Sequence, residues 1–405
     1  MVGYIFILAV NLLMINYKKH AWAEIDLDAF QSNLNKIKAF VGDCEVIAVI
    51  KADAYGHGAI KLGQYLNELG VRSFAVSCVR EAIELRKSGI EGNILILGYT
   101  DPDEIELLSC YSFAQTVYSL DYAKAISSAL ENSGKNIDVH IKLNTGMNRL
   151  GFNCQDELPT DKIVESLNLP HLNFKGLFTH FAAADRDGDP NGEFTRTQYV
   201  RFLEVKAALK SKGFEPEICH CCNSAGTLLN TDMHLSAVRT GIILYGLKPD
   251  SNLALPIELS PVMSFKATVS SIYKIEANQG ISYGLTFKTD KSLTAATVTV
   301  GYADGYPRFL SGCGEILING KRCRILGRVC MDQMVVDVTD VENVAIGSEA
   351  VLIGKSMGEE ITADEIAKLG GTINYEIVCG ISKRVPRYYI KNGKTADCVD
   401  YLWGL

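Results

Sequence analysis

The sequence predicts an α/β protein in which a (β/α)8 barrel, the TIM-barrel fold, is followed by a mostly antiparallel β domain. Up to about residue 247, short apolar runs alternate with amphipathic stretches, and beyond residue 250 the runs become β-rich and are separated by turn signals. Eight strands that alternate with helices favour a closed parallel barrel. An open doubly wound sheet is the alternative, and it is disfavoured because no glycine-rich turn follows the first run.

The expected barrel strands are the apolar runs of the first 250 residues. They cover residues 46–50, 73–77, 94–97, 113–117, 139–143, 174–178, 218–222 and 237–243. Helical patterns between the runs cover residues 60–69, 79–87, 120–133 and 194–212. We also expect residues 20–41 to form one helix that begins near Asp26-Leu27-Asp28 and crosses between the two domains.

The second domain is expected to contain short strands and one short helix. The strands cover residues 263–269, 293–300, 315–318 and 335–338, and Asn319-Gly320 marks a tight turn after one of them. A helix over residues 362–369 has a threonine cap and a glycine stop. We therefore expect an apolar extension over residues 1–19, a barrel domain over 20–250 and a β domain over 251–405.

The first 16 residues are almost wholly apolar and are followed by Lys18-Lys19. This run is short for a membrane-spanning helix, which needs roughly 20 residues, and it lacks the preceding positive charge of a secretory signal. It is either dispensable, with Met14 as the working start, or the stub of a membrane anchor, or a buried extension. The first alternative is favoured, so we expect a cytoplasmic chain that contacts a membrane only if residues 1–16 are an anchor.

Charge and cysteine content exclude several other classes. The chain has 40 Lys and Arg against 47 Asp and Glu, a net charge of −7, and no basic tract, so nucleic acid is a poor candidate partner. Among twelve cysteines only Cys219-His220-Cys221-Cys222 is dense. A strand would point alternate members of this run to opposite faces, whereas zinc needs tetrahedral ligands, usually from two separated pairs. We expect buried thiols in a reducing compartment and no metal site.

Polar residues gather where the expected barrel strands end, which is where barrel enzymes carry their chemistry. Lys51 closes the first all-apolar run, where an unpaired lysine is costly to bury and could serve as a nucleophilic amine. A lysine that simply reaches solvent is the alternative. The later runs carry or are followed by Lys142 and Arg149, Thr179-His180, Asn223-Ser224, and Arg239-Thr240-Gly241-Ile242. Together these residues predict one convergent polar site.

Four stretches resemble the alanine racemase family, which are pyridoxal phosphate (PLP) enzymes of fold type III. They are AVIKADAYGHG at 48–58, TGMNRLG at 145–151, GYADG at 301–305 and VCMDQ at 329–333. The resemblance extends over nearly all of residues 22–389. Asn144 and Cys222 stand where the family usually has aspartate and alanine, which puts local packing in doubt but touches neither base.

The resemblance implies two acid–base groups on opposite faces of the substrate. Lys51 would bind PLP covalently and act on one face, and Tyr283 would act on the other, reaching in from the second subunit of a homodimer. Arg239 would contact the pyridine nitrogen. The residues that would hold the cofactor are Lys51, Tyr55, Asn223, Ser224, Arg239, Gly241, Ile242 and Tyr375.

Further residues would bind the substrate or support the two bases. Arg149 and the backbone N–H of Met331 would orient the substrate carboxylate, and His180 would hydrogen-bond Tyr283. Lys142 matches a lysine that is often carbamylated in the family, and Tyr302 and Asp332 would support the site.

The resemblance therefore implies an alanine racemase that supplies D-alanine for peptidoglycan. Three alternatives remain. A membrane-anchored serine/alanine racemase would account for the apolar N-terminus. An amino-acid decarboxylase of the same fold type would need a C-terminal cysteine–aspartate signature, which we do not find. A non-catalytic PLP-binding protein would be a single barrel without the second domain.

Overall fold

The structure is a computed structural model that describes residues 20–185 and 188–403. The expectations for residues 1–16 lie outside the described residues. Contacts divide the chain into two compact units, which we call the barrel unit and the β unit. The barrel unit contains Ser32–Ala54 and Ala59–Leu259, and the β unit contains residues 20–31, Tyr55–Gly58 and the chain from Ser260 onward.

The predicted barrel is confirmed. Its eight strands are all parallel, in the order β5-β4-β3-β2-β10-β9-β8-β6, and a β5–β6 pairing closes the ring. Each expected apolar run overlaps one strand. The strands are β2 (Glu45–Val49), β3 (Ser73–Val76), β4 (Asn93–Ile96), β5 (Phe113–Val117), β6 (Ile137–Asn144), β8 (Leu172–Phe178), β9 (Ile218–His220) and β10 (Ala237–Thr240).

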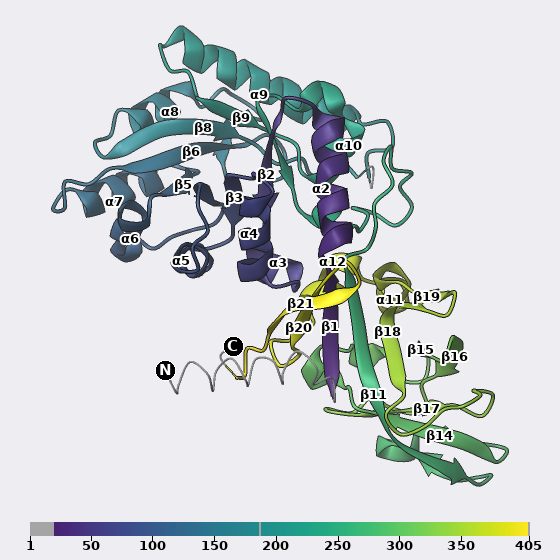
Figure 1. Ribbon diagram of the computed structural model, residues 1–405. Helices are drawn as coiled ribbons and strands as arrows, with labels where there is room; N and C mark the ends of the chain where they lie inside the picture. The colour runs from purple at the N-terminus through teal and green to yellow at the C-terminus, as the bar shows by residue number, and fades with distance from the viewer. Residues whose placement is uncertain (1–19, 186–187, 404–405) are drawn as a thin grey trace, which may run out of the picture. The chain divides into compact units, whose positions relative to one another are not determined.

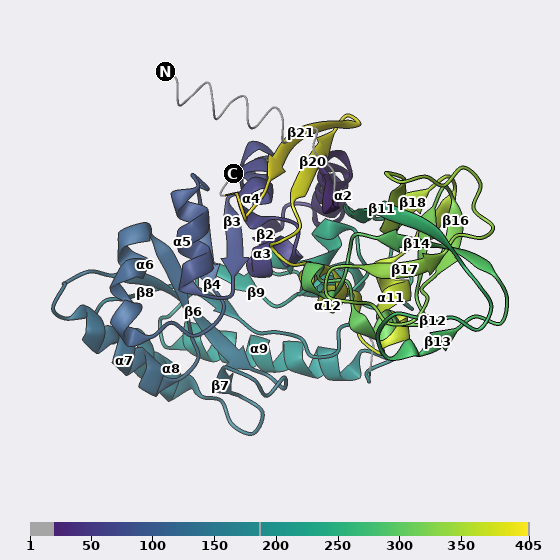
Figure 2. The ribbon, with the colours of Figure 1, turned by 90° about the horizontal axis from the view of Figure 1, so that it is seen from below.

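Helices lie outside these strands (Figure 2). They are α4 (Ala59–Glu68), α5 (Val79–Lys87), α6 (Glu106–Tyr111), α7 (Leu120–Leu130), α8 (Thr160–Leu167), α9 (Glu193–Ser211) and the short α10 (Ser224–Leu229). No α-helix directly follows β10. Instead α2 (Leu27–Val41), which precedes the first barrel strand in the chain, packs at this place, where Asn33 donates a hydrogen bond to the Leu244 carbonyl at 3.3 Å.

The β unit is a mostly antiparallel sheet, as predicted, with the order β16-β15-β18-β11-β1-β20-β21 (Figure 1). Its principal strands are β1 (Ala21–Asp26), β11 (Met263–Ile275), β15 (Glu315–Ile318), β16 (Lys321–Arg324), β18 (Glu349–Ser356), β20 (Arg387–Lys391) and β21 (Lys394–Val399). Strands β14 (Leu293–Val298) and β17 (Met334–Asp337) branch from β11, and β19 (Glu359–Ile361) pairs with β18. The short hairpin β12 (Gly280–Ile281) and β13 (Phe287–Lys288) precedes β14 in the chain.

Two local expectations in the β unit rest on turn and cap chemistry. Asn319 and Gly320 both have positive φ, 48° and 74°, as a two-residue hairpin between β15 and β16 requires. Helix α11 (Ala363–Gly370) begins after Thr362, whose hydroxyl accepts the Glu365 N–H at 3.0 Å. Its stop is Gly371, in the left-handed region, one residue beyond the expected glycine. A second short helix, α12 (Asn374–Cys379), follows.

The start of the chain differs from expectation. Residues 20–41 do not form one helix, because β1 forms first and pairs with β11 and with β20. Helix α2 then begins at Leu27, where the Asp26 carboxylate accepts the Ala29 N–H at 2.9 Å. Pairing with strands more than 200 residues away groups residues 20–31 with the β unit, whereas the sequence boundaries place them in the barrel domain. None of the helices in the described part of the chain has the length and apolar character needed to span a membrane.

Candidate active site

Lys51 stands directly after β2, at the start of an unusual backbone turn. Residues 52–55 all have φ between 51° and 54°, which is a left-handed helical turn built without glycine. Each such L-residue costs roughly 1–2 kcal/mol, so the surrounding structure must hold the turn in place. Strained backbone of this kind concentrates at functional sites, and here it immediately follows the candidate nucleophile.

Glu81 on α5 holds the beginning of this turn. Its two carboxylate oxygens accept the backbone N–H groups of Ala52 and of Ser77, each at 2.7 Å. The turn is closed farther along by the Asp53 carboxylate, which accepts the Ala59 N–H at 2.8 Å. A single carboxylate therefore ties the peptide after Lys51 to the loop that follows β3.

The carboxyl ends of the barrel strands bring four of the predicted residues into one cationic cluster, which we define as Lys51, Lys142, Arg149 and Arg239. Burial and, to a smaller extent, the charges of Arg149, Arg239 and Lys51 together lower the pKa of the Lys142 amine to about 8. Burial and the same four cations hold the pKa of His180 well below its usual range, so this imidazole is neutral at pH 7. The cluster has the field of an anion-binding site.

Arg239 is the most buried member of the cluster and is 3% exposed. Its guanidinium donates to the carbonyl oxygens of Thr179 (2.8 Å), His220 (3.0 Å) and Cys221 (2.9 Å). It also donates to ring nitrogens of His220 (2.6 Å) and His180 (3.3 Å), and it lies 5.3 Å from the Phe178 ring centroid. These neutral partners fix the position of the guanidinium but leave its charge without compensation, and burial lowers its pKa to about 10.

Next to Arg239, two helix starts meet. The Ser224 hydroxyl at the start of α10 accepts the Gly241 N–H at 2.9 Å, and Gly241 begins a 3-10 turn over Ile242–Tyr245. The Asn223 side chain caps α10 by accepting the Gly226 N–H at 2.9 Å. The first N–H groups of both turns have no partner within the helix, so they can bind the oxygens of a phosphate.

In the β unit, the two remaining motifs form one structure. The N–H groups of Tyr302 and Ala303 donate to the carbonyls of Cys330 and Met331, each at 3.0 Å. A Cβ on Gly301 would lie 2.3 Å from both of those carbonyl oxygens, so this close approach requires glycine.

Arg384 links the same two segments from a third part of the chain. It contacts the buried carboxylate of Asp304 at 3.2 Å and Asp332 at 2.7 Å. Asp304 in turn accepts the Gly301 N–H at 2.9 Å. The 301–305 and 329–333 stretches are therefore joined by backbone hydrogen bonds and by the two ion pairs of Arg384. These contacts fix the backbone at Met331.

Tyr283 belongs to the same region of the β unit. The neighbouring Ser282 hydroxyl donates to the Arg328 carbonyl at 2.7 Å, which attaches the Tyr283 loop to the segment before Met331. The Tyr283 side chain itself is 70% exposed. Elsewhere in the unit the rings of Tyr55 and Tyr375 lie 6.0 Å apart, and burial raises the pKa of Tyr55, which keeps its hydroxyl a hydrogen-bond donor.

The predicted residues thus fall into two groups, one in each unit. Lys51, Lys142, Arg149, His180 and Arg239 form the charged end of the barrel, with Asn223, Ser224, Gly241 and Ile242 beside Arg239. Tyr283, Tyr302, Met331 and Asp332 belong to adjoining loops of the β unit. Within the described residues no group of three or more histidine, cysteine or acidic side chains is placed to hold a metal ion.

Sequence reasoning missed the residues that position the others. Glu81 is one of two glutamates on its helix, and nothing in the sequence marks Arg384. The buried imidazoles of His140 and His220 had a usable signal. Residues 140 and 142 share one face of β6 by strand alternation, so the sequence alone could have placed His140 on the same face as Lys142.

Comparisons with known proteins identify the family of this chain. Residues 25–249 match the family model of the alanine racemase N-terminal domain, and residues 262–389 match that of the C-terminal domain. The alanine racemase of Clostridium novyi is 42% identical over 96% of this chain and its own full length, and that of Carboxydothermus hydrogenoformans is 44% identical over 91% of this chain and 99% of its own.

Solved structures agree in fold. The alanine racemase of Bacillus anthracis with bound L-Ala-P has a TM-score of 0.90 at 38% identity, over 96% of this chain and 100% of that one. The Clostridium difficile 630 alanine racemase in complex with cycloserine has a TM-score of 0.88 at 38% identity, with the same coverage. Fold and site together define a barrel enzyme with a cationic cluster at the carboxyl ends of its strands. The chain belongs to the alanine racemase family.

The contacts of Glu81 generate a stability prediction. Replacing Glu81 by alanine leaves the Ala52 and Ser77 N–H groups without their acceptor, so we expect the free energy of unfolding to fall by about 1–3 kcal/mol. The matched control is Glu84→Ala on the same helix, whose exposed side chain should change stability by less than about 0.5 kcal/mol. Denaturant titration measures both, and equal effects of the two substitutions would contradict the role of Glu81.

The lowered pKa of Lys142 predicts a pH-dependent gain in stability. Its pKa is about 8 in the folded chain against 10.5 ordinarily, so the charged amine destabilises the folded state below pH 8 and this penalty disappears as the pH rises through 10.5. Lys142→Met should therefore stabilise the chain at pH 7 by at most about 3 kcal/mol.

That gain should shrink toward pH 10.5. Thermal melts in buffer free of carbon dioxide, which would carbamylate the lysine, measure it. A gain that stays constant from pH 7 to 10.5 would reflect apolar packing alone and would contradict the electrostatic account.

Proposed function

We propose that this chain interconverts L-alanine and D-alanine with bound pyridoxal phosphate, using Lys51 and Tyr283 as its two acid–base groups. The observation that carries the proposal is the cationic cluster of Lys51, Lys142, Arg149 and Arg239, which stands at the carboxyl ends of the barrel strands with only neutral groups around its most buried arginine. The product would supply D-alanine for peptidoglycan.

The donor set suits pyridoxal phosphate. The phosphate dianion is matched by the backbone N–H groups of Ser224 and Ile242, on either side of the Gly241–Ser224 hydrogen bond, and its charge is matched by the cluster. The Thr240 hydroxyl, next to Gly241, is buried and has no hydrogen-bond partner among the described residues, which leaves a polar atom beside this cradle. Lys51 supplies the amine that would bind the cofactor's aldehyde, and Tyr55 and Tyr375 would add hydroxyl donors.

The cofactor, when bound, withdraws electrons from the substrate Cα and so makes its proton removable. The chain must then hold a proton on either face of Cα, and one group cannot easily serve both faces. We assign the Lys51 amine to one face and the Tyr283 hydroxyl to the other. Arg239 is a permanent cation, so placing it at the pyridine nitrogen disfavours a proton there. This would limit transamination as a side reaction.

The tautomer of His180 supports a role beside Tyr283. Arginine can only donate, so we assign the His180 Nδ1 atom, 3.3 Å from Arg239, as an acceptor that shares an N–H with a neighbouring carbonyl, which puts the proton of this neutral ring on Nε2. His180 can therefore donate from Nε2 to the oxygen of Tyr283, which would stabilise that oxygen when it has given up its proton.

We assign Tyr283 to the site of a second subunit in a homodimer. Exposed large side chains of the β unit are suited to such an interface: Tyr283 is 70% exposed and Leu285 is 60% exposed. Arg149 and the Met331 N–H would bind the substrate carboxylate, and Tyr302 and Asp332 would hold the Met331 segment. A carbamate on Lys142 would replace a buried cation by an anion that pairs with Arg149.

The activity is tested directly by adding PLP and L-alanine to the purified chain and measuring D-alanine with a D-amino-acid-specific coupled reaction. We expect conversion in both directions, with L-serine a poorer substrate than L-alanine. No conversion of either amino acid while PLP remains bound would favour the non-catalytic PLP-binding alternative. A preference for serine would favour the serine/alanine racemase alternative.

The two-base assignment predicts complementation between inactive variants. Lys51→Ala should abolish the cofactor link that borohydride traps, and Tyr283→Phe should retain PLP but lose about 10²- to 10⁴-fold in turnover. If each site combines Lys51 of one subunit with Tyr283 of the other, mixed dimers of the two variants contain one intact site and regain activity. Absence of rescue after demonstrated subunit exchange would contradict the shared site.

A further inference from the structure

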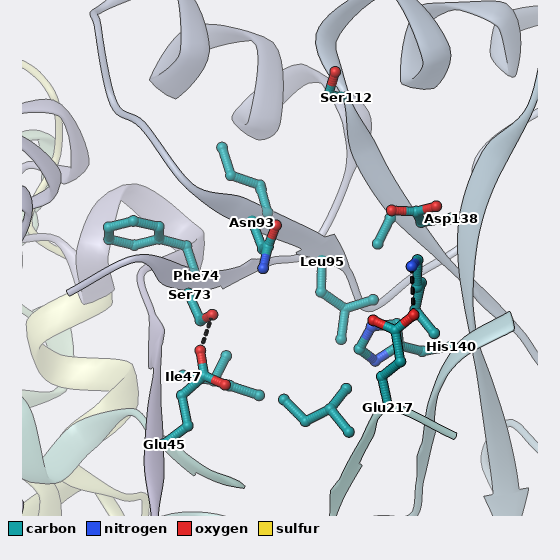
Figure 3. A pocket seen from close by; sticks show the side chains of 14 residues that line it. Glu45, Ile47, Ser73, Phe74, Asn93, Leu95, Ser112, Asp138, His140 and Glu217 are labelled. Carbon is teal, nitrogen blue, oxygen red and sulfur yellow. Dashed lines mark hydrogen bonds and ion pairs between the residues drawn. The ribbon is translucent and has the colours of Figure 1, made fainter. Parts of the chain in front are cut away.

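A polar cavity opens at the end of the barrel opposite the cationic cluster. It has a volume of about 370 Å³ and is lined by residues near the amino ends of the barrel strands, up to the fourth position of β6 and β8 (Figure 3). Its charged lining residues are Glu45, Asp138, Glu217 and Lys175, and Lys175 pairs with Glu217 at 2.5 Å. His140 on β6 also lines this cavity although its side chain is only 8% exposed.

Two imidazoles connect this cavity to Arg239 through the barrel interior. His140 Nδ1 lies 3.0 Å from His220 Nε2, and His220 Nδ1 lies 2.6 Å from a guanidinium nitrogen of Arg239. His220 also stacks on Phe178, with ring centroids 4.7 Å apart. Barrel interiors are normally filled by layers of branched apolar side chains. A pair of buried imidazoles at this place is therefore unusual and indicates a specific role.

The direction of every hydrogen bond in this chain follows from Arg239. Arginine is a donor only, so His220 Nδ1 must accept, and the proton of the neutral His220 ring must lie on Nε2. His220 therefore donates to His140 Nδ1, and the His140 proton lies on its own Nε2. That N–H has no hydrogen-bond partner among the described residues, and His140 lines the cavity. Burial and Arg239 keep both rings neutral, lowering the pKa of His140 to about 4 and that of His220 well below its usual range.

The strand opposite His140 is shaped for this ring. Gly176 on β8 is its register partner, and a Cβ there would lie 2.3 Å from His140 Nδ1. The β6–β8 register also shifts between Val139 and His140. The glycine and the register shift at this one position indicate that the backbone is adapted to make room for the His140 ring.

We propose that His140 and His220 are positioning residues, a hydrogen-bonded chain of single direction that runs from the amino-end cavity to Arg239 and holds its guanidinium in place. If the His220 proton moved to Nδ1, two donors would face each other and Arg239 would be displaced. His140 prevents this by accepting only from Nε2 of His220. The consequence for catalysis rests on the proposed role of Arg239, whereas the His140–His220–Arg239 hydrogen bonds can be observed without cofactor.

The first test determines by NMR which ring nitrogen of each histidine carries the proton in the cofactor-free protein. The sequence has seven histidines, so a ¹⁵N-histidine-labelled sample gives few ring signals, which His140→Asn and His220→Asn assign. Long-range ¹H–¹⁵N spectra at pH 7 should show both rings neutral and protonated on Nε2. A His220 ring protonated on Nδ1, or on both nitrogens, would overturn the proposal whether or not the chain racemises alanine.

The second test compares two substitutions of His140 in the enzyme with bound pyridoxal phosphate. Asparagine places its oxygen where histidine has Nδ1, so His140→Asn keeps the acceptor and should retain activity, whereas His140→Leu removes it and should lower racemisation about tenfold. The displaced Arg239 should also raise the pyruvate formed by transamination per racemisation turnover. The matched control is Ser73→Ala. Ser73 lines the cavity but does not belong to the His140–His220–Arg239 hydrogen bonds, so this variant should change neither the racemisation rate nor the pyruvate formed.

A double-mutant cycle separates positioning from general damage. His220→Asn keeps an acceptor for Arg239 but removes the donor to His140, so adding His140→Leu to it should cause no further loss. Losses that multiply, equal losses in His140→Asn and His140→Leu, or a fall in racemisation without more pyruvate would each contradict the proposed chain. If the parent chain does not racemise alanine, the proposed function fails, and the spectra still decide on the hydrogen-bonded chain.

Discussion

The burial of positive charge at the carboxyl end of the barrel is the constraint on which the rest of the site depends. Arg239 is 3% exposed and Lys142 is 6% exposed, and the charges of Arg149, Arg239 and Lys51 act on the Lys142 amine. The groups that hold Arg239 are carbonyl oxygens and neutral imidazoles. Dipoles fix a buried cation but do not cancel its charge. A ligand that brings a phosphate and a carboxylate would supply the missing negative charge.

Positioning in this chain is done by residues that touch none of the proposed chemistry. Glu81 holds the peptide after Lys51, Arg384 links the loops around Met331, and His220 orients Arg239. Glu81 acts at a left-handed turn, Arg384 at the close approach of two backbones over Gly301, and His220 in a cluster of like charges. Each holds a backbone or side chain in a conformation that would be unfavourable without it. The reacting groups themselves can then be few and simple, because their neighbours determine where they point.

Sequence reasoning predicted what depends on local pattern and on the geometry common to parallel barrels. Lys51, Lys142 and Arg239 could be placed together because the carboxyl ends of parallel strands meet at one face. The hairpin at Asn319-Gly320 follows from turn chemistry. Strand β1 was misread as helix because its partners lie near residues 265 and 388. The roles of Glu81 and Arg384 depend on such distant contacts too, so no local signal could indicate them.

The central claim, that the cationic end of the barrel is built for an anionic cofactor, is tested most directly by comparing two ligands of the cofactor-free chain. Pyridoxal phosphate and pyridoxal share the ring and the aldehyde and differ in the phosphate. Charge-assisted hydrogen bonds of about 1.5–3 kcal/mol each predict that calorimetric titration will show pyridoxal phosphate binding at least about a hundredfold more tightly. Equal affinities for the two compounds would contradict the account.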